Sequence, residues 1–302
     1  MGGSGIDPLE LPRRGRQPSR PMGIHRANEL LGDWATWQLD NLGFSKRTVD
    51  RRHGSMRRWC RFLHPMPWMI ASPELLEEWL RSFPNPATRR AYLSDAASLY
   101  QWAVKRGLVK ADITADIIRP KEPKRLPRPM PEADAARAIL LATDTRVRLA
   151  LSLALYAGLR RAEICALDAD DVILGGDVPT ITVRKGKGGK DRTVPVHPIL
   201  SAELLHLAPR YGPVISRLDG RGRLSTAMLS ALIANHMEAV GSHHRLHGGR
   251  HRFGTQLAEV TGGDLQVVAD LLGHESLTTT RGYTQLSGVR TAAAVLRMPG
   301  VA

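Results

Sequence analysis

The segment LALYAGLRRAEICAL contains two adjacent arginines, Arg160 and Arg161, in otherwise apolar helical sequence directly after Gly158. A buried guanidinium without a partner costs several kcal/mol, so each arginine must pair with an acid or hold an anion. Glu163 can pair with one of them, which leaves the other for an anionic ligand. An ordinary Arg–Glu pair on the surface of a helix is the alternative.

The segment SHHRLHGGRHRFGT is rich in histidine and arginine. His247 and His251 have the i, i+4 spacing of a helical metal site, but no glutamate follows in the H-E-x-x-H manner and two glycines would loosen such a helix. We therefore expect no metal here. The remaining His-x-x-Arg pair ends at Arg250; His274 follows 24 residues later and Tyr283 33 residues later. Tyr283 fits neither the alternation of a strand nor the spacing of a helical core.

The segment RKGKGGKDR separates two β-type runs and surrounds three glycines with the basic residues Lys185, Lys187, Lys190 and Arg192. It is not a Walker A phosphate loop, because that motif needs a wider glycine spacing and a Ser or Thr after its lysine. A lysine at the tip of a hairpin can nevertheless swing into a neighbouring site.

In this order, GLRRAE, GKGGK, HGGRH, LGH and Tyr283 resemble the active-site sequence of the tyrosine recombinase family, which includes phage integrases and Xer-like proteins. The match covers the whole second half of the chain. The resemblance implies six catalytic residues: Arg160, Lys187, His247, Arg250, His274 and Tyr283. Glu163 resembles the acid that supports the first arginine. Arg161 and Gly249 depart from the family pattern, and Gly249 stands where an apolar residue is usual.

The resemblance also implies the chemistry. Arg160 and Arg250 would clamp the non-bridging oxygens of a DNA phosphate and stabilise the charge of the transition state. His247 would take the proton of Tyr283, Lys187 would protonate the departing 5′ oxygen, and the tyrosine would become joined to the 3′ phosphate. The bond energy is conserved, so neither ATP, a cofactor nor a metal is expected.

The charge of the chain supports a polyanionic partner. The formal net charge of the 302 residues is +14. Residues 1–130 carry 23 Lys and Arg against 13 Asp and Glu, or +10, and the rest carry 20 against 16, or +4. Nucleic acid is the simplest such partner, although a merely soluble basic surface is the alternative. The first half is the expected DNA clamp.

The pattern along the chain predicts two domains. Residues 1–22 mix Gly, Pro and Arg and are expected to be a disordered basic arm, too short for a separate folded DNA-binding module. Residues 23–118 show four or five helical patterns, which predict a helical core-binding (SAM-like) domain. The Pro-rich basic stretch 119–131 is the predicted linker. Residues 132–302 predict a catalytic domain with a C-terminal tail, and the fold class is mainly α with a small antiparallel β-sheet in residues 170–196.

The second predicted helix is strongly basic around a narrow apolar seam of Val49, Met56, Trp59 and Phe62. A solvated face would normally mix acids with bases, but only Asp50 interrupts this one. Contact with phosphates or with a major groove is the favoured interpretation, and a solvated surface the alternative. The predicted DNA-binding residues here and in the linker are Lys46, Arg47, Arg51, Arg52, Arg57, Arg58, Lys124 and Arg125. The six tryptophans are expected in the core.

Cys60 and Cys165 have no metal-ligand spacing, no run of 18 apolar residues occurs, and no signal peptide is evident. These features favour a cytoplasmic protein, nucleoid-associated when bound to DNA and without a membrane partner. We expect a site-specific recombinase, and the favoured role is that of a phage or mobile-element integrase. Xer-type resolution, a type IB topoisomerase and a non-catalytic DNA-binding protein are the alternatives. The expected partners are double-stranded attachment sites, four protomers on two duplexes, and accessory host or phage factors.

Overall fold

A computed structural model describes residues 23–121, 126–184, 191–220, 222–274 and 280. The chain divides into two compact units between residues 124 and 125. This division falls within the stretch 119–131 that the sequence marked as a linker. The predicted N-terminal arm, and Lys124 and Arg125 of the linker, lie outside the described residues.

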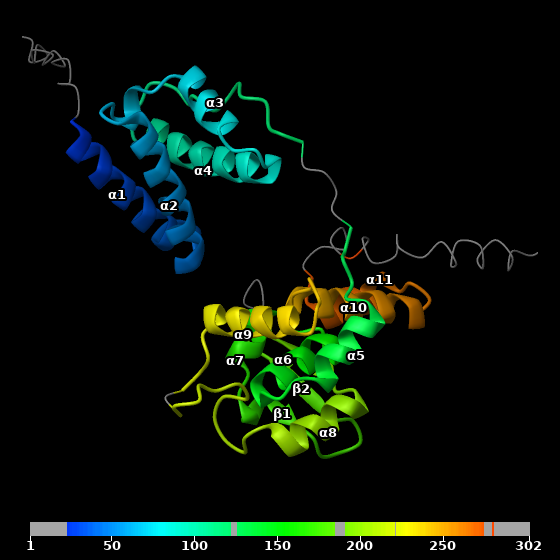
Figure 1. The fold of residues 1–302 in the computed structure, drawn as a ribbon. Coiled ribbons are helices and arrows are strands. Elements are labelled where there is room, and N and C mark those ends of the chain that lie inside the picture. The colour runs from blue at the N-terminus through cyan, green and yellow to red at the C-terminus, as the bar shows by residue number, and fades with distance from the viewer. Residues whose placement is uncertain (1–22, 122–125, 185–190, 221, 275–279, 281–302) are drawn as a thin grey trace, which may run out of the picture. The chain divides into compact units, whose positions relative to one another are not determined.

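The first unit is a bundle of helices (Figure 1). Its elements are α1 (Ile24–Leu42), α2 (Lys46–Leu63), the short 3-10 helix η1 (Trp68–Ile70), α3 (Pro73–Arg81) and α4 (Pro86–Lys105). Local chemistry sets the helix ends, because the side chains of Ser45 and Ser72 accept hydrogen bonds from backbone N–H groups of the first turns of α2 and α3. Gly43 ends α1 in the left-handed conformation, with φ +62°.

Tryptophans form the centre of this bundle, as the sequence predicted. Trp34, Trp59 and Trp68 are fully buried. Tyr100 joins two of them, because its hydroxyl accepts a hydrogen bond from Trp59 Nε1 at 3.2 Å and donates one to the Trp68 carbonyl at 2.6 Å. Phe62, the last residue of the apolar seam of α2, is 41% exposed and stacks on Trp59 with the ring centroids 5.8 Å apart.

The second unit is mainly helical with one small antiparallel sheet, which confirms the predicted fold class. Its described helices are α5 (Glu132–Leu140), α6 (Thr145–Tyr156), α7 (Arg161–Ala166), the 3-10 helix η2 (Ala169–Asp171), α8 (Pro198–Leu207), α9 (Thr226–Ala239), α10 (Leu246–Val260) and α11 (Leu265–Leu272). The strands β1 (Val172–Ile173), β2 (Thr180–Val183) and β3 (Arg192–Pro195) pair in that order, with Ile181 opposite Val194. Both of these residues are buried, so one face of the sheet packs on the core.

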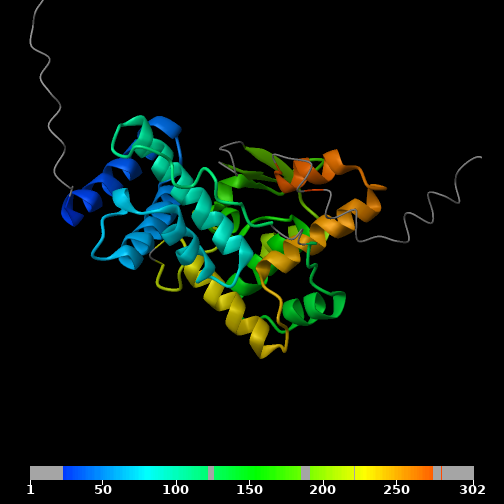
Figure 2. The ribbon, with the colours of Figure 1, turned by 90° about the horizontal axis from the view of Figure 1, so that it is seen from above.

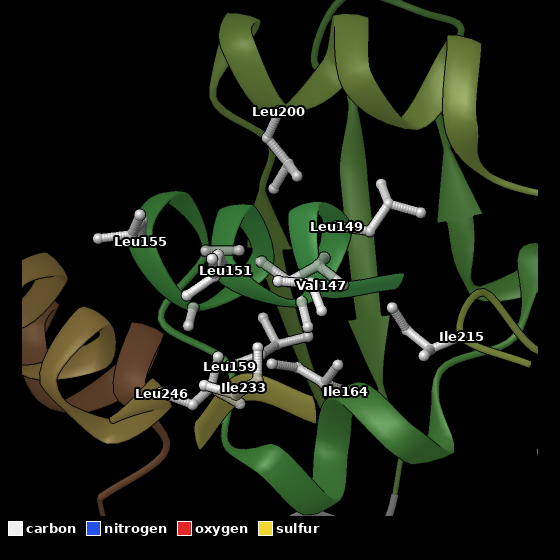
Figure 3. Close-up of a cluster of buried hydrophobic side chains, with 14 of the residues drawn as sticks. Val147, Leu149, Leu151, Leu155, Leu159, Ile164, Leu200, Ile215, Ile233 and Leu246 are labelled. Atoms are coloured by element: carbon white, nitrogen blue, oxygen red, sulfur yellow. The ribbon is translucent and has the colours of Figure 1, made fainter. Parts of the chain in front are cut away.

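Helix α6 is the centre of the second core. Leu149, Leu151, Leu153 and Leu155 are all buried, and α5, α7, α8, α9 and α10 pack around the helix (Figure 3). Residues 149–155 of this helix are all buried, as expected of a helix segment that protein encloses on every side. Helix α6 has only 12 residues, and among the described residues no helix is long and apolar enough to cross a membrane.

Helix α10 differs from the sequence expectation. Gly248 and Gly249 were expected to loosen a helix, but both lie inside α10 and are buried. A Cβ atom at Gly249 would stand 3.4 Å from side-chain atoms of Ala154 and Leu155 on α6. This is ordinary van der Waals distance, so α10 lies directly against α6 at Gly249. Helix α8 was not predicted.

Candidate active site

Arg160 is the N-cap residue of α7 and comes two residues after Gly158, whose backbone is left-handed with φ +63°. It donates from Nη1 to Glu163 Oε1 at 2.8 Å and from Nη2 to the Gly273 carbonyl at 2.9 Å. Glu163 also accepts the backbone N–H of Arg160 at 2.7 Å, which caps the first turn of the helix. The Arg160 side chain is 25% exposed. One edge of the guanidinium is thus held by protein while part of the side chain stays accessible to an anion.

Arg250 lies on α10 and is almost fully buried, with 1% of its surface exposed. It donates from Nη1 to the Gly158 carbonyl at 2.5 Å and from Nη2 to the Leu272 carbonyl at 2.6 Å. Its Nη1 is also 3.9 Å from Glu163 Oε2. These acceptors compensate the cost of burying the charge and fix the orientation of the guanidinium.

His247 is one helical turn before Arg250, so their side chains share a face of α10. Partial burial, together with the charges of Arg250 and Arg160, lowers the pKa of His247 below its ordinary value. The imidazole is therefore neutral near pH 7 and can accept a proton. The ring of His251 lies edge-on to it, with the centroids 4.2 Å apart, and burial lowers the pKa of His251 to about 4.

His274 follows Gly273, which ends α11 in the left-handed conformation. Its backbone N–H donates to the Ala269 carbonyl at 2.9 Å, and its Nδ1 is 3.0 Å from the hydroxyl oxygen of the buried Thr280. The position of the ring is thus set by the end of α11. Arg160 reaches this point through the Gly273 carbonyl, so α7, α10 and α11 meet here.

The structure brings together four of the six predicted catalytic residues: Arg160, His247, Arg250 and His274. Lys187 and Tyr283 lie outside the described residues, and their roles stay predictions. Arg161, the departure from the family pattern, is directed to another helix and donates to the hydroxyl of Ser230 on α9.

Glu163 is the acid at the centre of this group. Its side chain is 7% exposed. Burial by itself raises the pKa of the carboxyl group, but hydrogen bonds from Arg192 and Arg160 outweigh burial and lower the pKa to about 2. The carboxylate is therefore ionised throughout the neutral range. The predicted pairing of Glu163 with Arg160 is present.

Arg192 is the member of the group whose role the sequence did not reveal. It is the first residue of β3, which lies beside α11 (Figure 2), and it donates to both oxygens of Glu163 at 2.9 and 2.8 Å. In the sequence, Arg192 is marked only as a basic residue at the end of a glycine-rich hairpin. Lys185 and Lys190 have the same feature, so it does not single out Arg192.

In the described parts of the chain, no three His, Cys, Asp or Glu side chains are grouped so that they could hold a metal ion. The charged groups that meet at Glu163 are guanidinium groups. This donor set suits an anion, because arginine has no acceptor and cannot coordinate a cation.

Arg51 and Arg52, two of the arginines predicted to contact DNA, surround the buried Asp95 of the first unit. Arg51 donates to both oxygens of the buried Asp95 at 2.7 and 2.9 Å, and Arg52, 17% exposed, donates to Gln38 at 3.0 Å. A buried carboxylate needs such partners. Arg51 and Arg52 therefore stabilise the bundle, and their contact with DNA stays a prediction.

The other basic residues of α2 are on its exposed side. Lys46 pairs with Asp50 at 3.0 Å, and Arg58 donates to the hydroxyl of Tyr92. Arg47 and Arg57 are exposed as well. This face of the helix can meet a phosphate backbone without disturbing the core.

The comparisons with known proteins agree with this site. The model of the phage integrase family matches residues 132–289, more than half of the chain. The tyrosine recombinase XerA of Pyrococcus horikoshii is 34% identical over 174 residues, 56% of this chain and 60% of the relative. The chain thus spans less than two thirds of the length of that relative. The tyrosine recombinase XerC of Mycobacterium bovis is 32% identical over 245 residues, 72% of this chain and 79% of the relative.

Among solved structures, a lambda integrase tetramer bound to a Holliday junction matches with a TM-score of 0.70. The match covers 87% of this chain and 77% of that chain at 16% identity, so the likeness concerns the fold. The family match and the XerC relative, together with the arginines and histidines gathered around Glu163, establish that this chain is a member of the phage integrase family.

Proposed function

We propose that the chain is a site-specific recombinase that cuts and rejoins duplex DNA through a bond between Tyr283 and a 3′ phosphate. The observation that carries the proposal is that Arg160 and Arg250 donate to the adjacent carbonyls of Gly273 and Leu272, beside a neutral His247. Residues far apart in the chain thus form one anion-binding group with a proton acceptor. This is what attack by a phenol on a phosphodiester requires.

The charge of the group favours a phosphate. Arg160, Arg192 and Arg250 contribute three positive charges and Glu163 one negative charge, which leaves two positive charges among these four residues. Arg160 is the arginine of the three with the largest exposed fraction, 25%, and is the first contact for a phosphate oxygen. The buried Arg250 stabilises the additional charge that develops as the nucleophile approaches phosphorus.

The reaction is a balanced exchange of phosphodiester bonds. The bond from the Tyr283 oxygen to phosphorus forms as the bond from phosphorus to the 5′ oxygen breaks. The phenol proton passes to His247, and the 5′ oxygen takes a proton from Lys187. A 5′ hydroxyl from the partner duplex then attacks the phosphotyrosine and releases the enzyme. One phosphodiester is replaced by another, so ATP is not consumed.

The partners of this reaction are double-stranded attachment sites. The basic face of α2, with Arg47, Arg57 and Arg58, would contact phosphates, while the catalytic unit acts on the cleaved bond. Exchange of strands between two duplexes needs four active sites. A related fold is found in a lambda integrase tetramer on a Holliday junction, which supports four protomers here. Residues 287–302 lie outside the described residues; their docking on a neighbouring protomer stays a prediction, with packing on the same protomer as the alternative. Accessory host or phage factors would control direction.

Integration by a phage or mobile element is the first candidate role. Resolution of chromosomes or plasmids is the second, because relatives of this chain carry the names XerA and XerC. An integrase recombines two different attachment sites, whereas a resolution enzyme recombines two copies of one site. Sequencing the DNA crosslinked to a Tyr283→Phe protein in cells would distinguish them.

The proposed chemistry is tested with a nicked suicide substrate, from which the small 5′ fragment diffuses away after cleavage. We expect the native protein to accumulate as a covalent adduct and Tyr283→Phe to bind the same DNA without forming it. Plasmid relaxation with no recombination of two sites would indicate a topoisomerase instead. A Tyr283→Phe protein that still formed the adduct would contradict the assignment of the nucleophile.

A further inference from the structure

Arg192 connects the sheet to the candidate active site. Besides its two hydrogen bonds to Glu163, it donates from Nε to the Leu271 carbonyl at 3.0 Å. The side chain is only 11% exposed. We propose that Arg192 is a positioning residue for DNA cleavage: it holds Glu163 and the end of α11 in the arrangement that Arg160 and His274 need. This inference rests on the proposed function.

Arg192 and Arg160 share the carboxylate of Glu163. Each of its oxygens accepts one hydrogen bond from Arg192 and one from Arg160, whose backbone supplies one of the latter two. Removal of Arg192 therefore takes away two of these four bonds. Glu163 could then rotate, and the side chain of Arg160 would lose the rigid acceptor that aims it.

Arg192 also holds the C-terminal end of α11. The last carbonyls of a helix have no partner within the helix and must find donors elsewhere. Here three consecutive carbonyls accept from three different arginines: Leu271 from Arg192, Leu272 from Arg250 and Gly273 from Arg160. His274 follows directly. Arg192 thus fixes the same few backbone atoms as the two catalytic arginines.

The Arg192 side chain packs closely against Gly273. A Cβ atom at Gly273 would stand 3.0 Å from Arg192 Nη1 and 3.2 Å from its Cδ and Cζ. Arg192 therefore determines how near β3 and the end of α11 can approach each other. A lysine cannot reproduce this contact, because it has one compact charged group instead of a planar fork.

The experiment compares Arg192→Gln with Arg184→Gln. Arg184 follows β2 on the other side of the same hairpin and pairs with Asp171, and its side chain is 63% exposed. Both variants remove one positive charge near the hairpin, but only Arg192→Gln removes contacts to Glu163 and α11. Single-turnover cleavage of the suicide substrate and DNA affinity are measured for each. We expect Arg192→Gln to cleave about 100-fold more slowly with little change in Kd, because misplacement by about 1 Å costs that much. Arg184→Gln should stay within about fivefold of the native rate.

A pH profile separates positioning from a merely structural role. Without Arg192, burial raises the pKa of Glu163 while only Arg160 and the more distant Arg250 oppose it. Arg192→Gln should therefore lose further activity as pH falls below about 5, where the native Glu163 remains ionised. This loss is measured relative to the native protein at the same pH, because protonation of His247 slows both proteins below about pH 6.5. The additional loss should be absent when Glu163→Gln is added, because the amide does not titrate.

Arg192→Lys keeps the charge and should recover part of the cleavage rate. A cleavage rate of Arg192→Gln equal to that of the native protein would overturn the inference. It would also be overturned if the Gln and Lys variants lost cleavage, DNA binding and thermal stability to the same extent. A native protein that formed no adduct at all would contradict the proposed function instead. The two failures are thus distinguishable.

Discussion

Gly158 supplies the carbonyl that holds Arg250, and its backbone is in the left-handed region with φ +63°. A Cβ atom there would stand 2.4 and 2.8 Å from ring atoms of Phe253 and 3.1 Å from Leu272 Cδ2. Gly158→Ala should therefore be destabilised both by its conformation and by overpacking. Gly262 has the same φ, but a Cβ atom at Gly262 would meet no atom within 4 Å.

The pair of glycines allows the two costs to be separated. Left-handed backbone with a side chain costs about 1–2 kcal/mol, which is the expected loss for Gly262→Ala. Overpacking adds about 1–3 kcal/mol, so Gly158→Ala should lower the free energy of unfolding by about 2–5 kcal/mol. Its cleavage rate should fall as well, because the displaced turn carries the acceptor of Arg250.

Urea unfolding followed by circular dichroism measures both losses. All six tryptophans belong to the first unit, so their fluorescence reports that unit separately and serves as an internal control. Adding Phe253→Leu to Gly158→Ala should restore most of the overpacking loss, with a coupling energy of about 0.5–3 kcal/mol. Equal losses for Gly158→Ala and Gly262→Ala would refute the reasoning.

Three further predictions concern the pKa of His247, the core of the first unit and its basic face. Because the pKa of His247 is lowered, its neutral form persists as the pH falls. The rate of adduct formation should therefore stay constant from about pH 8 to about pH 6.5 and fall only below that. A rate that already declined near pH 8 in rapid-quench measurements would exclude His247 as the proton acceptor. Asp95→Ala should lower the free energy of unfolding of the first unit by about 3–5 kcal/mol, since it leaves Arg51 and Arg52 without the carboxylate between them, and tryptophan fluorescence in urea checks this. Arg57→Ala should weaken DNA binding and lower the slope of log K against log salt by about 0.9, and an unchanged slope in a salt titration would remove Arg57 from the DNA contacts.

The sequence by itself determined the local features of this protein. Except for α8, helix positions followed from the spacing of apolar residues, and helix ends from residues such as Ser45, Ser72 and Gly43. The three short strands followed from β-type runs between glycine turns. Four predicted catalytic residues lie near one another, while Lys187 and Tyr283 fall outside the described residues. These predictions succeed because capping and periodicity act over a few residues.

Only the tertiary structure decided which charged groups meet. Nothing in the sequence near Arg192 indicates that it pairs with Glu163, and nothing near Arg51 indicates Asp95. The contact of α10 with α6 at Gly249 is likewise set by the packing of distant segments. The physical reason is the same in each case: a buried charge or a close helix contact needs a partner, but the partner comes from a distant segment that packing brings near. Spacing along the chain identifies the groups that need partners, and the packed fold selects the partners.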